Sequence, residues 1–276
     1  MPELPEVEVV CRGLRSFLIG RTITALRWSG KALRHPLDLE AMQHTLINQR
    51  ITAIERRAKF LQISLDLGAM LIIHLGMTGK LGIFPPSTAH AKHDHMLWSL
   101  DNGMELRFND TRRFGSIRFL NPVEVQGREE TIFKTTGIEP FSEQFSGTYL
   151  RTLAKGKSLA VKLLIMTNQN VAGIGNIYAN ESLFAAGIRP TRKAHTLSLK
   201  EWNRLVIEIR RVLQYAIECG GSTISDFLNA SGQRGYFQIN FKVYGREGQE
   251  CNLCSTTIKK QPLGGRASYF CPHCQK

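Results

Sequence analysis

The sequence has no long run of apolar residues. Its longest strictly aliphatic stretches, such as Met70-Leu71-Ile72-Ile73, are far too short for a transmembrane helix, which needs about 20 residues. The N-terminus is acidic and lacks the apolar segment of a signal peptide. We therefore expect a cytoplasmic protein with no membrane partner.

Acidic residues are also scarce. The chain has 276 residues, with 36 Lys and Arg against 23 Asp and Glu, which gives a net charge of +13. Such an excess favours a polyanionic partner, most commonly nucleic acid. The alternative is a solvated basic surface that binds nothing. No internal repeat or low-complexity segment is evident.

Cysteine is infrequent, and four of the six cysteines stand in two close pairs. The spacing Cys251-x2-Cys254-x16-Cys271-x2-Cys274 is typical of a tetrahedral zinc site. Four protein thiolates leave no open coordination position, so the single Zn²⁺ is expected to be structural. Disulfides are a poor alternative in the cytoplasm, where the isolated Cys11 and Cys219 should stay reduced.

The first residues, Met1-Pro2-Glu3-Leu4-Pro5-Glu6, contain an unusual nucleophile. Removal of Met1 would leave a secondary amine on Pro2, and an α-amino group has a pKa of roughly 7.7–8.0. Attack on a sugar C1′ would form an iminium ion, with Glu3 as the nearest proton donor or acceptor. The ordinary alternative is a helix N-terminus with Pro in its first turn and favourable carboxylates.

The spacing of apolar residues predicts an α+β protein. A helix is expected over 5–19, followed by short β-type runs in an antiparallel sandwich or flattened barrel. These runs are 22–28, 51–54, 60–65, 70–75, 81–84, 96–100, 105–108 and 116–120. Residues 123–150 are expected to form a loop-rich linker, and helices are expected over 158–168, 176–186 and 198–218.

Several short motifs fit DNA contact. Gly173-Ile174-Gly175 precedes a helix, where backbone amides bind phosphate, although a lone G-x-G is also typical of a tight helix–helix turn. Arg56–Phe60 and Asn109–Gly115 place cations and a Phe between strands. They could clamp phosphates and wedge a base stack, or be solvated hairpins with a core Phe.

Two further motifs contain residues with alternative roles. Met77, in His74-Leu75-Gly76-Met77, is either a second wedge or a core residue. Lys92-His93-Asp94-His95 resembles a metal motif, but we favour His93 as a phosphate contact. Residues 231–276 carry seven Lys or Arg against two Glu, so this segment is expected to face a phosphate backbone. The Gly- and Ser-rich residues 220–236 are interpreted as a loop over the base.

Together these motifs resemble the bacterial formamidopyrimidine-DNA glycosylase family. The resemblance runs from end to end through Pro2–Glu8, Arg57–Lys59, His74–Met77, Lys92–His95, Asp110–Gly115, Gly173–Ala179 and the cysteine pairs. It implies an N-terminal β-sandwich, a helix–two-turn–helix domain and a C-terminal zinc-ribbon hairpin. The expected boundaries are 1–122 for the catalytic domain, 123–150 for the linker, 151–232 for the helical domain and 233–276 for the ribbon.

The resemblance also implies residue roles. Pro2 would be the Schiff-base nucleophile, Glu3 the proton donor to the sugar, and Lys59 and Arg266 the supports of β- and δ-elimination. Glu6 and Glu181 would shape the site. Phosphates would be held by His93, Arg112, Lys157 and Asn176, and the gap left by the flipped base would be filled by Met77, Arg112 and Phe114. Arg112 would face the orphaned cytosine.

The expected function is therefore base excision repair by a monomer acting on double-stranded DNA. The enzyme would be a DNA glycosylase for 8-oxoguanine and formamidopyrimidines that also cleaves the abasic strand. One rival is the sister enzyme endonuclease VIII, against which Leu4, Met77 and Phe114 argue. Another is a zinc-ribbon DNA-binding regulator, which leaves the Pro2-Glu3 terminus unexplained.

Overall fold

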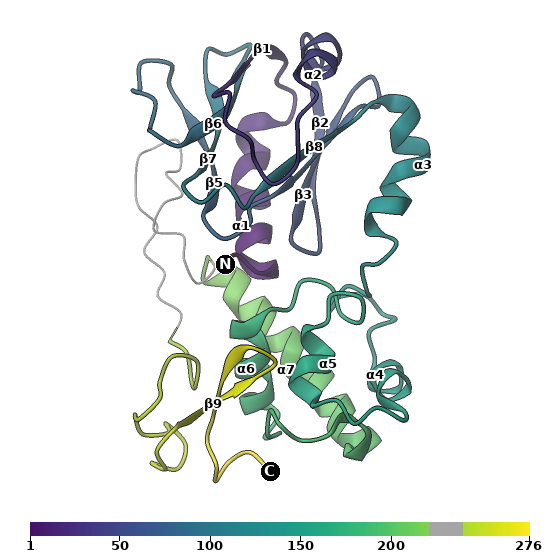
Figure 1. Cartoon of the computed structure of the whole chain (residues 1–276), viewed down its shortest axis with the longest axis vertical. Coiled ribbons are helices and arrows are strands. Elements are labelled where there is room, and N and C mark those ends of the chain that lie inside the picture. The colour runs from purple at the N-terminus through teal and green to yellow at the C-terminus, as the bar shows by residue number, and fades with distance from the viewer. Residues whose placement is uncertain (221–239) are drawn as a thin grey trace. The chain divides into compact units, whose positions relative to one another are not determined.

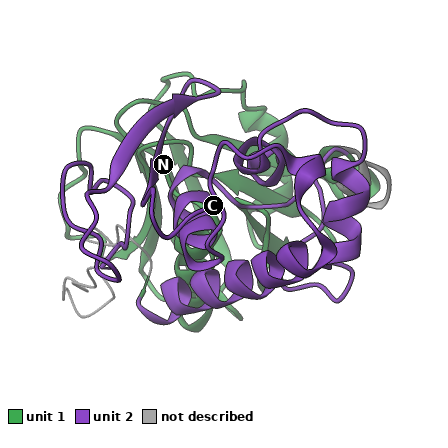
Figure 2. Ribbon diagram, turned by 90° about the horizontal axis from the view of Figure 1, so that it is seen from below, with its two compact units in different colours: residues 1–134, 220–238 green, residues 135–219, 239–276 purple. Residues whose placement is uncertain are grey.

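The computed structural model describes residues 1–220 and 240–276, apart from the side chains of residues 126–131. Residues 1–134 form one unit, and residues 135–219 with 240–276 form a second (Figure 2). The segment expected to cover the base, 220–236, lies outside the described residues except for Gly220.

The first unit begins with α1 (Leu4–Leu18), which confirms the expected N-terminal helix (Figure 1). Pro5 stands in the first turn, where a missing N–H removes no intrahelical hydrogen bond. The residues that recur at helical spacing are buried, namely Val7, Val10, Cys11, Leu14 and Leu18. One face of α1 is therefore part of the core.

Three side chains hydrogen-bond α1 to the neighbouring strand. Arg15 Nε donates to Ile54 O at 2.9 Å, and Cys11 Sγ donates to Glu55 O at 3.4 Å. Arg56 Nε donates to the Glu8 carboxylate at 3.0 Å. Burial raises the pKa of Cys11 to about 12, so this thiol stays protonated and unreactive.

Eight strands follow, and each of the eight expected runs is confirmed. They form two antiparallel sheets with the orders β1-β6-β7-β5 and β2-β3-β4-β8. The strands are β1 (Ile23–Trp28), β2 (Ile51–Arg57), β3 (Phe60–Leu65), β4 (Met70–His74), β5 (Gly79–Phe84), β6 (Asp94–Leu100), β7 (Glu105–Asp110) and β8 (Ser116–Leu120).

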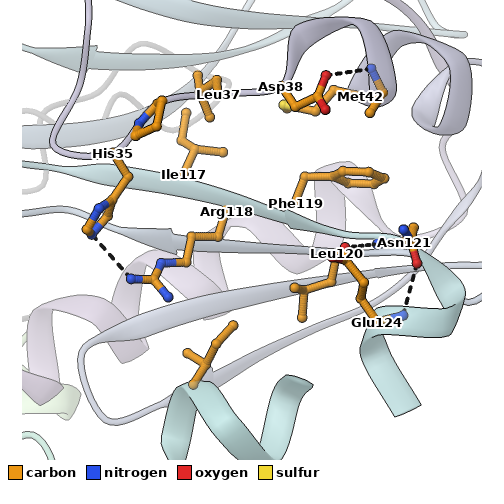
Figure 3. A pocket seen from close by; sticks show the side chains of 13 residues that line it. His35, Leu37, Asp38, Met42, Ile117, Arg118, Phe119, Leu120, Asn121 and Glu124 are labelled. Atoms are coloured by element: carbon orange, nitrogen blue, oxygen red, sulfur yellow. Dashed lines mark hydrogen bonds between the residues drawn. The ribbon is translucent and has the colours of Figure 1, made fainter. Parts of the chain in front are cut away.

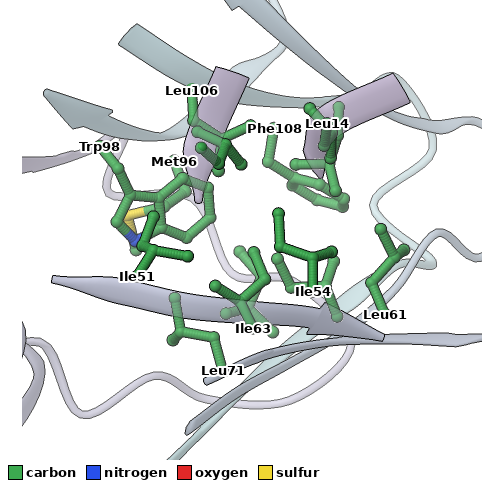
Figure 4. Packing of buried hydrophobic residues seen from close by; sticks show 14 of the residues in the cluster. Leu14, Ile51, Ile54, Leu61, Ile63, Leu71, Met96, Trp98, Leu106 and Phe108 are labelled. Carbon is green, nitrogen blue, oxygen red and sulfur yellow. The ribbon is translucent and has the colours of Figure 1, made fainter. Parts of the chain in front are cut away.

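The core of this unit lies between the two sheets and α1. Trp98 and Phe108 come from one sheet and Ile54 and Ile63 from the other, and all four are at most 1% exposed (Figure 4). Leu14 of α1 joins the same cluster. The shared core confirms the expected β-sandwich and makes the helix inseparable from it.

Three helices were not predicted from the sequence. They are α2 (Leu39–Leu46), α3 (Pro122–Phe133) and α4 (Gly147–Ala154). The expectation that residues 123–150 are loop-rich is therefore wrong over α3 and the start of α4. Asn121 and Glu124 form a capping box at the start of α3, a recognisable signal. Ile132 and Phe133 of α3 pack on the outer face of the second sheet.

The second unit is mainly helical. The expected helices are confirmed as α5 (Val161–Met166), α6 (Asn176–Ala185) and α7 (Leu199–Glu218), with a 3-10 turn, η1 (Ala194–Thr196), before α7. Ser198 and Glu201 cap α7, and the hydrogen bond from Arg192 lowers the pKa of Glu201 to about 2. Among the described helices, none has both the length and the apolar character required to cross a membrane.

A two-stranded hairpin completes the second unit. Strands β9 (Lys259–Leu263) and β10 (Arg266–Phe270) are joined by Gly264 and Gly265, at φ +57° and +71°, as a two-residue hairpin turn requires. Lys162 of α5 is fully buried and donates Nζ to Ala267 O at 2.9 Å and Ser268 Oγ at 2.7 Å. The hairpin is thereby fixed to α5.

Arg210 of α7 joins the long helix to the segment that precedes α4. Its guanidinium donates to Pro140 O and Ser142 O, both at 2.8 Å, and to Phe145 O at 2.9 Å. A planar guanidinium can reach several carbonyls at once, whereas an ammonium is a point donor. The side chain therefore satisfies three backbone acceptors in a segment without regular secondary structure.

Arg210→Ala should destabilise the second unit by roughly 2–4 kcal/mol, since hydrogen bonds from charged groups contribute about 1.5–3 kcal/mol each and are not additive. Urea unfolding followed by circular dichroism measures the loss. The neighbouring Arg211→Ala is a matched control, because Arg211 is 64% exposed and pairs only with Glu208 among the described residues. Equal effects of the two substitutions would contradict this role.

Candidate functional site

The N-terminus is held by the first turn of α1. The Glu3 backbone N–H donates to Glu6 Oε2 at 2.8 Å, and the Glu3 side chain accepts from the Glu6 backbone N–H. Both carboxylates are buried, at 2% and 3% exposure. Pro2 is half-buried, and Met1 is 56% exposed. Glu6 therefore fixes the backbone one residue from Pro2.

Lys59 lies in the β2–β3 turn, which the backbone holds in a tight conformation. Ala58 is fully buried at φ +53°, and its carbonyl accepts from Arg56 Nη1 at 3.1 Å. Burial, together with the charges of Lys59 and Arg34, lowers the pKa of His74 to about 4. His74 beside this lysine is therefore neutral near pH 7.

The two candidate wedges lie on turns that touch each other. The first turn contains Gly76 and Met77; a Cβ on Gly76 would lie 2.5 Å from the backbone N of Gly115 in the second turn. Met77 is 42% exposed and Phe114 is 46% exposed. Arg112 covers the Phe114 ring at 4.6 Å. These residues are not core residues, so that alternative is wrong.

The histidine motif after residue 91 is not a metal cluster. Asp94 accepts from Ala91 N and from Asn109 Nδ2, both at 2.8 Å. His95 is fully buried between Ser29 Oγ, at 2.9 Å, and the Asp110 carbonyl, at 3.0 Å. Because the carbonyl only accepts, Nε2 carries the proton in neutral His95. His93 is half-buried beside it, with ring centroids 6.1 Å apart.

In the second unit, the glycine turn leads directly into α6. Gly175 is the N-cap residue and Asn176 is the first helical residue. The Oδ1 atom of Asn176 is buried and has no hydrogen-bond partner among the described residues. The start of a helix favours anions, so the predicted phosphate contact fits this position.

Glu181 lies further along α6 and has a structural role that was not predicted from the sequence. Its carboxylate accepts from the backbone N–H groups of Lys242, Val243 and Tyr244 at 2.8–3.0 Å. The side chain is 6% exposed. Glu181 therefore anchors the chain where it leads into the cysteine-rich segment.

Two cationic candidates of the second unit are exposed on turns. Lys157 follows Gly156, which has φ +71°, and its carbonyl accepts from His195 Nδ1 at 2.8 Å. Arg266 is exposed at the start of β10, immediately after the Gly264-Gly265 turn. Both side chains can therefore contact a ligand without any change in the fold.

The four paired cysteines converge as a metal site. Their Sγ atoms all lie within 4.8 Å of one another. Individual separations are 3.3 Å (Cys254–Cys274), 3.5 Å (Cys254–Cys271) and 3.9 Å (Cys251–Cys274). Tetrahedral zinc with Zn–S bonds of about 2.3 Å requires sulfurs about 3.8 Å apart. The residues fit one structural zinc with no position left for a substrate.

The ribbon has little apolar core of its own. Val243, Ile258 and the buried cysteines pack against Phe184 of α6. At the end of the chain, Gln275 Nε2 donates to Ile188 O at 2.8 Å, and Arg189 N donates to Lys276 O at 2.9 Å. The metal site is therefore attached to the helical part of its unit.

A cavity of about 680 Å³ lies elsewhere in the first unit, between α2, β8 and α3 (Figure 3). His35, Arg118 and Phe119 are among its lining residues, and Arg118 Nη2 hydrogen-bonds His35 Nε2 at 3.3 Å. None of the predicted site residues lines this cavity. Its size therefore does not identify the functional site.

Sequence reasoning missed two buried polar residues beside the predicted ones. Asp110 is fully buried and accepts hydrogen bonds from the wedge turns. Lys162 holds the hairpin that bears Arg266. An Asp at the end of an apolar strand is a usable signal, since it suggests a side chain that bonds to the following turn. Lys162 has no comparable local signal.

Comparison with known proteins gives matches over nearly the whole chain. Residues 1–117 match the formamidopyrimidine-DNA glycosylase N-terminal domain, residues 136–228 its H2TH domain, and residues 248–276 a zinc finger found in FPG and IleRS. A formamidopyrimidine-DNA glycosylase of Magnetococcus marinus is 42% identical over 276 residues, which covers 100% of both chains.

Solved structures agree with this result. Lactococcus lactis Fpg in complex with an abasic site containing DNA has a TM-score of 0.89 and 32% identity, with 99% of each chain covered. The wild-type L. lactis protein with N7-benzyl-Fapy-dG containing DNA has a TM-score of 0.89 and 31% identity, with 100% of each chain covered. Domain order, identity and fold agree from end to end, and the chain belongs to the formamidopyrimidine-DNA glycosylase family.

Proposed function

We propose that this chain is a bifunctional base excision repair enzyme. As a glycosylase it removes oxidised purines, 8-oxoguanine and formamidopyrimidines, from duplex DNA; as a lyase it then cleaves the abasic strand. The observation that carries the proposal is Pro2 beside the buried Glu3 and Glu6, in a chain of this family. The related complexes with abasic-site and Fapy-dG DNA support the substrate class.

The first chemical step belongs to the N-terminus. Once Met1 is removed, the Pro2 nitrogen attacks C1′ and the bond from C1′ to the damaged base breaks. The departing base takes up the proton that the Pro2 nitrogen releases. Glu3 gives a proton to the sugar ring oxygen, the ring opens, and an iminium forms between Pro2 and C1′. The buried capping box supports this assignment, because it fixes the backbone of Glu3, the residue that follows Pro2.

Strand cleavage uses the acidity that the iminium confers on the sugar. Loss of a C2′ proton, supported by Lys59, expels the 3′ phosphate in β-elimination. A second elimination, supported by Arg266, expels the 5′ phosphate.

The target base must leave the duplex, which costs a few kcal/mol in lost stacking and pairing. Met77, Arg112 and Phe114 would fill the resulting gap, with Arg112 opposite the orphaned cytosine. Their exposure and the contact between their turns support this role. A guanidinium stacked on an aromatic ring presents a flat surface to the neighbouring bases.

Phosphates around the lesion would be held by His93, Arg112, Lys157 and Asn176. Glu6 and Glu181 would shape the site through the backbones that they anchor. The basic ribbon would follow the DNA backbone. We assign residues 1–122 to catalysis, 151–232 to helical DNA binding and 233–276 to the ribbon, with 123–150 connecting them. The enzyme would work in the bacterial cytoplasm, on nucleoid DNA.

Borohydride reduction of the intermediate should link Pro2 covalently to an 8-oxoguanine duplex. The amine must be free, because an amide lone pair is delocalised into the carbonyl. A form that keeps one extra residue ahead of Pro2 should bind DNA but give no adduct. Mass spectrometry locates the link. An adduct on Lys59 would move the nucleophile to that lysine, and tight binding without any adduct would favour a DNA-binding regulator.

Cys251→Ser should abolish stoichiometric zinc and weaken DNA binding while the first unit stays folded. A structural zinc contributes roughly 10–16 kcal/mol of folding free energy, and the ribbon has few apolar contacts to replace it. Metal analysis and titration with labelled duplex test this expectation. Cys219→Ser is the control, since Cys219 lies outside the sulfur cluster. If the zinc-free protein bound DNA with unchanged affinity, the ribbon would not be part of the DNA-binding surface.

Phe114→Ala should slow excision of 8-oxoguanine paired with cytosine more than excision of the same lesion in a bulge. Only the paired substrate requires a closed stack to be opened. Single-turnover rates on the two duplexes provide the comparison. Phe141→Ala, at a similarly exposed Phe (40%) of the second unit, should leave the ratio unchanged. Equal losses on both substrates would exclude a wedge.

A further inference from the structure

Asp110 is a buried junction at the end of β7. The residue is 0% exposed, and its backbone bonds to the histidine motif on both sides. Asp110 N donates to His93 O at 3.0 Å, and Asp110 O accepts from His95 Nε2 at 3.0 Å. The backbone that carries His93 is therefore fastened to this one residue.

The carboxylate of Asp110 bonds to both wedge turns. Oδ2 accepts from the backbone N of Gly115 at 2.7 Å, next to Phe114. Oδ1 accepts from the hydroxyl of Thr78, next to Met77, and more weakly from Arg112 N at 3.3 Å. The Thr78 hydroxyl in turn accepts from Arg112 N at 3.0 Å. One side chain thus bonds to Arg112 and to the residues that follow Met77 and Phe114.

Close packing also holds the two turns against each other. Gly76 leaves no room for a Cβ against Gly115, and a Cβ on Gly115 would lie 2.7 Å from Phe108 Cζ and 3.0 Å from Asp110 Oδ2. Charge-assisted bonds to backbone N–H groups are stronger than neutral ones. The hydrogen bonds of the Asp110 carboxylate and the close packing at Gly76 and Gly115 therefore both hold the two turns in place.

We propose that Asp110 is the positioning residue for base extrusion: it makes Met77, Arg112 and Phe114 one rigid wedge and couples that wedge to His93. The proposal rests on the proposed function, since it assumes that these side chains enter DNA. Asp110 itself would not touch DNA. Its effect should therefore appear in the opening of a paired site and not in the chemistry on an open one.

Asp110→Asn is the direct test. The amide keeps the shape but loses the charge. In one orientation its NH₂ group faces the Gly115 N–H; in the other it faces the Thr78 hydroxyl, which must turn to accept, and the Arg112 N–H. We expect the ratio of kcat/KM on paired 8-oxoguanine to kcat/KM on the bulged lesion to fall about tenfold. Activity on the bulged lesion, together with thermal unfolding, shows that the variant is folded.

Thr78 provides a second route if Asp110→Asn does not fold. Thr78→Val removes the hydroxyl that bridges Asp110 and Arg112 and should lower the same ratio, whereas Thr78→Ser keeps the hydroxyl and should restore it. Asp101→Asn is the matched control, because Asp101 is exposed in the β6–β7 turn. It should leave the ratio at the wild-type value.

A double-mutant cycle separates positioning from general stability. In a Phe114→Ala background, Asp110→Asn should lower the ratio much less than it does alone, because the two changes remove one device. Equal losses on paired and bulged lesions, or full additivity with Phe114→Ala, would overturn the proposal. Absence of excision by the wild-type protein would instead overturn the proposed function.

Discussion

The structure depends first on the burial of α1. A chain terminus ordinarily frays, yet the nucleophile that we propose at this terminus must be held in one place to react. Here Val7, Leu14 and Leu18 are fully buried in the sandwich core, and Arg15 and Cys11 bond the helix to the backbone of β2. The capping box then restricts the residues just ahead of the helix. Moving Pro2 far would require disrupting the core of the unit.

Buried carboxylates extend this control from the scaffold to the loops. Asp110 accepts from turns of the first unit, and Glu181 accepts three backbone N–H groups ahead of the ribbon. An ionised carboxylate is costly to bury unless donors surround it, and backbone N–H groups without partners are costly as well. The carboxylate and the backbone N–H groups therefore provide each other's hydrogen-bond partners. The loops keep exposed side chains while their backbones stay fixed.

Helices and strands with a regular apolar pattern were predictable from the sequence. Contacts between residues far apart in the chain were not. Apolar and polar residues alternate in β3 and β7, and α7 has apolar residues at helical spacing behind an N-cap. These patterns involve only residues close together in the chain, so the three elements were predicted correctly. α3 was missed because its composition is polar and its few apolar side chains pack on Met70, Ile72 and Leu120, which only the folded sheet brings together. Cys251 and its partners were found by spacing, whereas Lys162 bonds to Ala267, 105 positions away.

The hairpin that bears Arg266 is held at two ends by different means. At one end the cysteine cluster depends on a metal and on a small apolar patch shared with α6. At the other, Lys162 and Asn180 bond directly to the backbone of β10, at Ala267 and Tyr269. Because a buried ammonium needs acceptors to offset its lost hydration, Lys162 opposes any departure of the strand from α5. The position of Arg266 therefore depends on the helical core as much as on zinc.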